Sequence, residues 1–215
     1  LKNDGTLRAW GHNNLGQLGD RSTEDRLSPI FVDPLQDWAQ IAAGGDHAVA
    51  IGGDGSLWSW GRNDWGQLGD GSTTTGLRPV QIGQDTNWGA VAAGYIHSLA
   101  VKYGGSLYAF GANANGQLGD GGTTYQTTPE MIGLYNCATV TSGNYHNVVI
   151  KTDGSLWAWG YNAFGQIGDG STTVRKLPVQ IGGDRLWTAV AAGGNHSLGL
   201  EDHGLVWSWG NNSNG

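Results

Sequence analysis

Four histidines recur at one position of a repeated pattern and are the first candidates for chemistry. Each follows a glycine by three residues, in the order Gly-x-x-His: His47, His97, His146 and His196. Neutral imidazole is a common metal ligand, so four such side chains near one axis could hold a metal ion. Each histidine, however, is tied to the start of a repeated strand. The sequence therefore favours a structural hydrogen bond to the backbone over metal binding.

Two acidic turns could also bind a cation. Segments 69–74 and 168–173 each combine an aspartate with serine and threonine, and they resemble calcium loops loosely. They lack the alternating acidic ligands of a calcium loop, and Asp, Gly, Ser and Thr are ordinary turn residues. The repeated Gly-x-x-Gly spacing has no helix after it, so it forms no phosphate cradle. We therefore interpret these segments as turns and predict no cofactor and no metal.

No catalytic set of residues breaks the repetition. Serine, histidine and aspartate recur in every unit, whereas an active site usually depends on one unmatched set. The single cysteine, Cys137, cannot form an internal disulfide and has no cationic neighbour in sequence. It stands where other units have Trp38, Trp88 and Trp187, and we interpret it as a small buried filler. The sequence predicts a protein that is not an enzyme.

The elements that position these residues form a repeat of about fifty residues. The segment Leu156–Asp169 (LWAWGYNAFGQIGD) has near copies at Leu7–Asp20, Leu57–Asp70 and Leu107–Asp120. The closing aspartates are residues 20, 70, 120 and 169, so their spacings are 50, 50 and 49. A fixed period of this size marks a repeat architecture. We expect a single array over residues 1–215, with units at about 4–53, 54–103, 104–152 and 153–202 and a partial unit at 203–215.

Composition narrows the fold and the partners. The chain has 39 glycines and 11 tryptophans but only 13% charged residues, which is typical of a turn-dense all-β protein. Eleven Lys and Arg against 18 Asp and Glu give a net charge of −7, which disfavours nucleic acid and anionic membrane surfaces as partners. No apolar run approaches the length of a membrane span, so no membrane insertion is expected. The absence of an initiator methionine leads us to expect a fragment or a processed product.

Each unit contains four short strand signals. In the second copy, residues 91–94, 97–101 and 106–110 are predicted strands, and the fourth strand of the preceding copy is 79–82, whose proline fits an edge strand. Asp54-Gly55 predicts a tight hairpin. Alternation of large and small residues along the third strand suits sheets stacked face to face. Four antiparallel strands repeated radially describe a β-propeller blade; a linear β-solenoid is the alternative.

These motifs resemble the regulator of chromosome condensation repeat over essentially the whole chain. The matching residues in one unit are Asp54-Gly55, Trp58, Trp60-Gly61, Asn63, Gly66–Gly69, Pro79, Gly94 and His97–Leu99. The resemblance implies a propeller of about seven blades. The fold expected here is thus all-β, a β-propeller of four-stranded antiparallel blades with about four repeats plus a partial one, as an open arc or a section of a larger propeller.

Partner binding is expected where the units differ. The Gly-x-x-His turns and the Asn-x-x-Gly-Gln loops share one end of the blades, and combined exposed aromatics and arginine are typical of a protein interface. The variable residues at that end are Arg62, Asp64, Trp65, Tyr95, Ile96, Tyr145, Tyr161 and Phe164. The alternative is that these are loop aromatics packed against neighbouring loops.

The function expected from the sequence is a non-enzymatic propeller module for protein–protein interaction. We expect it to be part of a larger bacterial exported protein, located outside the cell or at its surface. One alternative is a structural filament subunit that self-associates head to tail through open blade edges. Another is an enzyme inhibitor or a nucleotide-exchange-type binding propeller, as in known members of the resembled family. Uniform unit lengths and the acidic charge disfavour the exchange role.

Overall fold

Short runs of alternating large and small residues, separated by glycine turns, form antiparallel strands throughout the chain. The computed structural model describes residues 1–33 and 37–213, and within these ranges it contains 17 strands in five sheets. Residues 34–36 of the first predicted unit and 214–215 of the partial unit lie outside the described ranges. No helical stretch within the described ranges has the length and apolar character needed to cross a membrane.

The strands belong to consecutive sheets. The first sheet contains β1 (Arg8–Gly11) and β2 (Arg26–Phe31); the second contains β3 (Trp38–Ala43), β4 (His47–Gly52), β5 (Leu57–Gly61) and β6 (Gly76–Gln81). The third contains β7 (Trp88–Ala93), β8 (His97–Lys102), β9 (Leu107–Gly111) and β10 (Gln126–Met131). The fourth contains β11 (Cys137–Ser142), β12 (His146–Lys151), β13 (Leu156–Gly160) and β14 (Arg175–Ile181). The fifth contains β15 (Trp187–Ala192), β16 (His196–Glu201) and β17 (Val206–Gly210).

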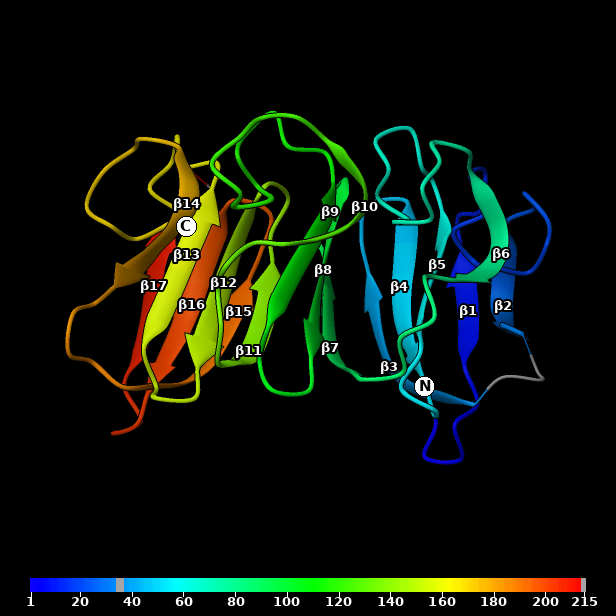
Figure 1. The fold of residues 1–215 in the computed structure, drawn as a ribbon, viewed down its shortest axis with the longest axis horizontal. Helices are drawn as coiled ribbons and strands as arrows, with labels where there is room; N and C mark the ends of the chain where they lie inside the picture. Colours follow the sequence, from blue (N-terminus) through cyan, green and yellow to red (C-terminus); the bar gives the residue numbers. More distant parts are fainter. Residues whose placement is uncertain (34–36, 214–215) are drawn as a thin grey trace.

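The sheets stand side by side as an open arc, with the first sheet at one end and the fifth at the other (Figure 1). Their first strands follow one another along the inside, because β3 contacts β7, β7 contacts β11 and β11 contacts β15. The expected all-β propeller architecture with antiparallel four-stranded blades is confirmed. Both β1 and β17 occupy the third-strand position of their sheets, so a closed ring of four blades would require them to share one position.

The sheets are out of phase with the sequence units. Residues 54–103 supply β5 and β6 to the second sheet but β7 and β8 to the third. Each internal unit is therefore divided between two neighbouring sheets, which ties the sheets together covalently.

The fourth strand begins earlier than predicted. β6 spans Gly76–Gln81, whereas the expected strand was 79–82. The register changes between Ser59 and Gly61, so the residues before Pro79 rejoin the ladder beyond a bulge. β6 lies at the edge of its sheet, where a strand has a neighbour on one side only. The N–H that Pro79 lacks is therefore not needed to join two inner strands.

An aromatic ring of the third strand rests on a glycine of the preceding sheet's long loop, and in the second, fourth and fifth sheets this ring is a tryptophan. The Trp159 indole Nε1 donates to the Gln117 carbonyl at 3.0 Å, and a Cβ on Gly119 would lie only 2.7 Å from that nitrogen. Trp60 makes the same contact with Gln17 and Gly19. The small neighbour Ala158 points the other way, into the cluster that contains Trp187 of the fifth sheet. The predicted pairing of large and small faces is confirmed.

The histidines form a second link between sheets, but not the predicted one. His47 Nε2 lies 2.9 Å from Ser98 Oγ, and His97 Nε2 lies 2.7 Å from Asn147 Oδ1. The Ser98 hydroxyl itself donates to the Gln67 carbonyl, so it accepts from His47. The prediction of a backbone partner was wrong, because the second strand of the next sheet places a polar side chain within reach. The role of these histidines is nevertheless structural.

Burial keeps these histidines neutral. Burial lowers the pKa of His47 to about 3 and that of His97 and His146 to about 4. Each Nδ1 is also buried without a hydrogen-bond partner, so a protonated ring would leave a charged N–H unsatisfied.

Cys137 is buried, as predicted, and its neighbours compensate for its size. Trp187 lies over Gly199, where an added Cβ would collide with the ring, and Trp88 clusters with Ala100. At the corresponding place in the fourth sheet, Cys137 clusters with the larger Val149. Burial raises the pKa of the Cys137 thiol to about 11, which makes this cysteine a poor nucleophile.

We predict that acid destabilises the protein through the three buried histidines. In the unfolded chain their pKa is about 6.5, so between about pH 6.5 and 4 the unfolded state binds protons that the folded state rejects. The free energy of unfolding should fall with decreasing pH by up to about 1.4 kcal/mol per pH unit per histidine. Urea unfolding at stepped pH measures this slope. His97→Gln should make it shallower and the exposed control His12→Gln should not; a stability that stays constant from pH 7 to 5 would contradict the prediction.

We also predict that Cys137→Trp destabilises the folded chain, although three other units have tryptophan at the same position. The ring would meet Val149, and overpacking of this kind costs about 1–3 kcal/mol. Adding Val149→Ala should restore part of the loss, because the pair would then match Trp88 with Ala100. Urea unfolding of both variants checks this, and a single variant as stable as the parent would show that the site has spare room.

Candidate interaction surface

Two kinds of connection lie at one end of the sheets, which we call the loop end. The turns between first and second strands are residues 44–46, 94–96, 143–145 and 193–195, and the loops between third and fourth strands include 62–75 and 161–174. The long connections after β5, β9 and β13 lie along the upper edge in Figure 1.

An asparagine amide at the centre of each long loop sets its shape. Asn63 Nδ2 donates to Asp70 Oδ1, Ser72 O and Thr74 O, each at 3.1 Å, while its Oδ1 accepts from the Leu68 N–H. The loop oxygens that a calcium ion would need therefore point at an amide nitrogen. A cation could enter only by displacing this side chain, so the loops do not fit a calcium site.

Four of the predicted residues form a continuous row of rings, which we call the aromatic strip: Tyr95, Tyr145, Tyr161 and Phe164. Successive ring centroids are 5.9, 6.4 and 6.2 Å apart, and each pair packs edge to face. Tyr95 and Phe164 at the ends are exposed, whereas Tyr145 and Tyr161 are half-buried. The strip joins a turn of the third sheet to a turn and a long loop of the fourth. Packing between rings and partial exposure thus occur together.

Arg62 and Asp64 lie beside the Tyr95 end of the strip. Arg62 Nε donates to Asp64 Oδ2 at 2.7 Å, and its Nη1 lies 3.6 Å from Asp46 Oδ2. The hydrogen bond to Asp64, with the nearby charges of Asp64, Asp46 and Tyr95, raises the pKa of the Arg62 guanidinium. This cluster, Arg62 with its two carboxylates, holds one more negative than positive charge.

The remaining predicted residues lie apart from the strip. Trp65 packs edge to face on Tyr125 at 6.1 Å, and both rings are exposed. Ile96 is half-buried in the turn that carries Tyr95. Sequence reasoning missed Asp46 and Tyr125. Asp46 precedes its histidine just as Ile96 does, so comparison of the units could have found it; Tyr125 has no such signal beyond its position in a long loop.

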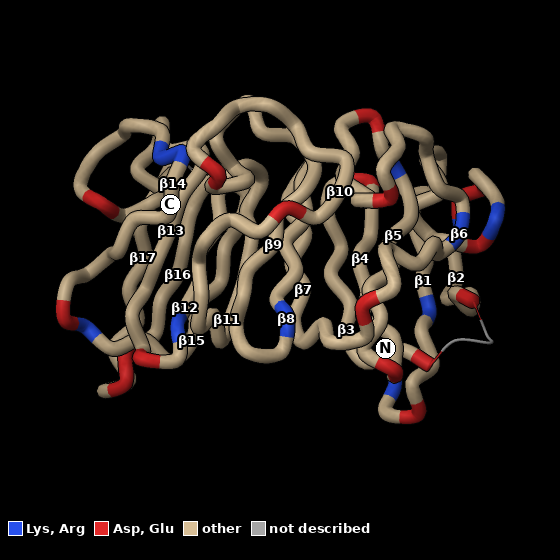
Figure 2. Tube along the Cα trace, in the orientation of Figure 1, with Lys and Arg blue, Asp and Glu red and all other residues tan. Residues whose placement is uncertain are grey.

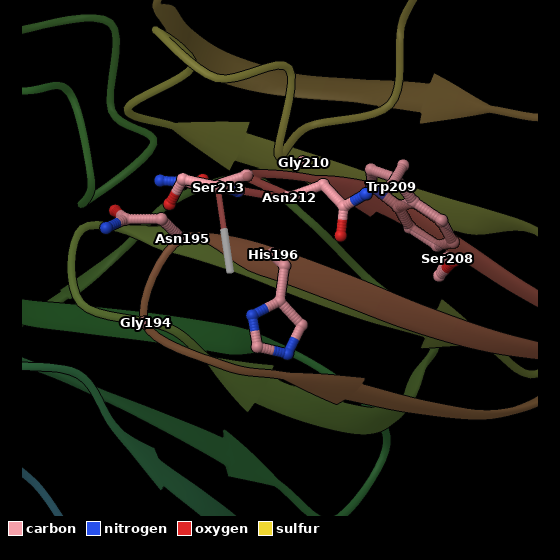
Figure 3. Close-up of a pocket in the computed structure, with 9 residues that line it drawn as sticks. Gly194, Asn195, His196, Ser208, Trp209, Gly210, Asn212 and Ser213 are labelled. Carbon is pink, nitrogen blue, oxygen red and sulfur yellow. The ribbon is translucent and has the colours of Figure 1, made fainter. Parts of the chain in front are cut away.

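A large hollow lies elsewhere, on the outward face of the fifth sheet. It measures about 700 Å³ and is lined by His196, Trp209 and the backbone from Gly210 to Ser213, as Figure 3 shows. His196 corresponds to His97, which at an internal joint bonds the next sheet. The hollow therefore corresponds to the place where, between two inner sheets, the next sheet packs. A smaller recess of about 240 Å³ lies between the glycine turns of the second to fifth sheets.

Comparison with known proteins agrees with this architecture. Three solved structures share the fold with a TM-score of 0.85 each: human WBSCR16 (23% identity), yeast RCC1 (Prp20) bound to Kap60 (23%) and Prp20p from Saccharomyces cerevisiae (22%). They cover 94%, 99% and 99% of this chain, and the chain covers 55%, 53% and 55% of theirs. The chain thus spans about half the length of these structures.

Sequence comparison gives the family directly. No curated protein matches the chain. A second pattern of the same repeat matches residues 38–67, 90–117, 137–166 and 187–215, in phase with the first strands of the sheets. The full repeat matches four times, at residues 4–51, 54–101, 104–150 and 153–200. The chain therefore belongs to the Regulator of chromosome condensation (RCC1) repeat family.

Proposed function

We propose that this chain is a non-enzymatic binding module that captures a protein partner on its loop end. The observation that carries the proposal is the aromatic strip with the neighbouring Arg62 cluster, which extends over the second, third and fourth sheets. Aromatic and arginine side chains dominate the energetics of protein interfaces. Here they stand on loops whose bases are fixed by buried hydrogen bonds, so little ordering is needed on binding.

The solved relatives support a protein as the partner. One was crystallised with Kap60 bound, and Prp20p binds Gsp1p and histones. Lys and Arg are dispersed along this chain, as Figure 2 shows, and the net charge is −7, which supports a protein rather than nucleic acid. Enzyme inhibition or nucleotide exchange would be special cases of such binding.

We extend the proposal to location. Compact, nearly identical repeats with one buried cysteine support a bacterial exported protein at or outside the cell surface. Fractionation of the source cells tests this, and an exclusively cytoplasmic protein would refute it.

A second candidate function is self-assembly through the outward face of the fifth sheet. The favouring observation is the exposed apolar surface there, with Leu198 39% exposed and Val206 72% exposed. One feature of the chain weakens such a contact between copies. Ala48 stands where Ser98 and Asn147 accept from a histidine, so a second copy would offer His196 no side-chain acceptor.

We predict that Tyr145→Ala and Trp65→Ala each reduce partner capture at least tenfold and lower the free energy of unfolding by less than about 1 kcal/mol. Immobilised variants are compared by the amount of crosslinked partner recovered from source extract, alongside urea unfolding. Tyr103→Ala is the matched control, since Tyr103 is 71% exposed in a turn at the opposite end. If Tyr103→Ala reduces capture equally, the loop end is not the binding surface.

If the chain self-assembles through the fifth sheet, the average mass of its particles should rise with protein concentration, as measured by sedimentation velocity. Val206→Asp should suppress this rise, because it places a charge on the apolar face. A single monomeric species at every concentration would eliminate self-assembly.

A further inference from the structure

We infer that the loop end recognises an extended, cationic segment of its partner, with Arg or Lys at alternate positions laid along the aromatic strip. This inference rests on the proposed function and adds the chemistry of the partner. Three features of the surface lead to it: its charge, the pairing of Arg62, and the spacing of the rings.

The loop end is strongly acidic. Its turns and loops carry only two basic residues, Arg21 and Arg62. They carry eight acidic residues, namely Asp20, Glu24, Asp25, Asp46, Asp64, Asp70, Asp120 and Asp169. On neighbouring strands, Arg26 and Arg175 form ion pairs of 2.5 Å with Asp20 and Asp169, and Lys176 lies against Gly116 of a long loop. The acidic residues still outnumber these cations, so complementarity of charge across an interface favours a basic partner.

The arginine beside the aromatic strip, Arg62, is not free to bind an anion. Arg62 Nε is engaged by Asp64, its Nη1 faces Asp46, and its backbone N–H donates to the Asp46 carbonyl at 2.8 Å. The Asp64 side chain is 55% exposed, so the cluster presents carboxylate to solvent, and Arg62 of the cluster lies near Tyr95. A partner cation approaching Tyr95 would meet both an aromatic ring and a partly exposed carboxylate.

The aromatic strip supplies matching sites for cations. Arg and Lys bind over aromatic faces within about 6 Å of the ring centroid. Ring centroids in the strip are 5.9–6.4 Å apart. In an extended chain, alternate side chains on one face repeat at roughly 6.4–6.8 Å. The spacing of the rings therefore matches the spacing of alternate side chains in an extended segment, and the most open rings are those at the two ends of the strip, Tyr95 and Phe164.

The test uses three fluorescein-labelled octapeptides and the full chain in anisotropy titrations. One peptide alternates Arg and Ser, one has four Arg followed by four Ser, and one alternates Glu and Ser. We expect the alternating Arg peptide to bind at least threefold more tightly than the block peptide and the Glu peptide not to bind. Higher salt should weaken the Arg complex.

Variants locate the binding. Tyr161→Leu and Asp64→Asn should each weaken binding of the alternating Arg peptide at least fivefold, and Asp64→Asn should also reduce its salt dependence. Tyr103→Leu, at the opposite end, should leave binding unchanged. Urea unfolding checks that Tyr161→Leu folds; Tyr95→Leu, at the exposed end of the strip, is the second variant if it does not.

Several outcomes would overturn the inference. Three outcomes would each do so: equal binding of the alternating and block Arg peptides, binding that neither Tyr161→Leu nor Asp64→Asn weakens, or binding of the Glu peptide. If Tyr145→Ala abolishes capture of the natural partner but no Arg peptide binds, the proposed function stands and the cationic segment is refuted. If capture is also independent of Tyr145, both are refuted.

Discussion

The whole arc depends on one joint, in which the third strand of a sheet rests on the loop of the sheet before it. The Gln117 carbonyl accepts both the Trp159 indole N–H and the Asn147 amide, at 3.0 and 2.7 Å. A buried carbonyl must be paired, and this one is paired twice by the following sheet. Beneath the ring, Gly119 has no space for a side chain. The packing of the ring on glycine and the hydrogen bonds to the buried carbonyl thus require the same placement of the two sheets. Together they fix how neighbouring sheets stack.

The same joint supports the candidate interaction surface. The loop that receives the third-strand ring of the next sheet also carries variable residues such as Trp65 and Phe164 a few positions earlier. Its constant part is held by Asn63 or Asn162 and by contact with the next sheet. Variable side chains on a constant, hydrogen-bonded loop are a general way to attach binding to a repeat scaffold. The residues proposed to bind are therefore presented by the parts of the chain that hold the scaffold together.

Departures from the repeat show which features the fold requires. Phe110 replaces the third-strand tryptophan in the third sheet, and the Gln67 carbonyl then keeps only its bond from Ser98. Cys137 replaces a first-strand tryptophan where Val149 fills the space. Such exchanges preserve core volume and leave each buried carbonyl with a donor, and cores tolerate substitutions of this kind.

The sequence alone determined the repeat, the all-β class, the hairpins and the stacking of large on small residues, because these follow from periodicity and turn chemistry within about fifty residues. It also located the end of the sheets where the units differ. Only the tertiary structure decided which of those residues meet. Tyr95, Tyr145 and Tyr161 are far apart in sequence, and they form one strip because three successive turns and loops are brought together by sheet stacking. The partners of His47, His97 and His146 likewise lie about fifty residues away, on a strand of the next sheet. No local pattern encodes such contacts, since they depend on the distance and angle between sheets, which the buried joints set.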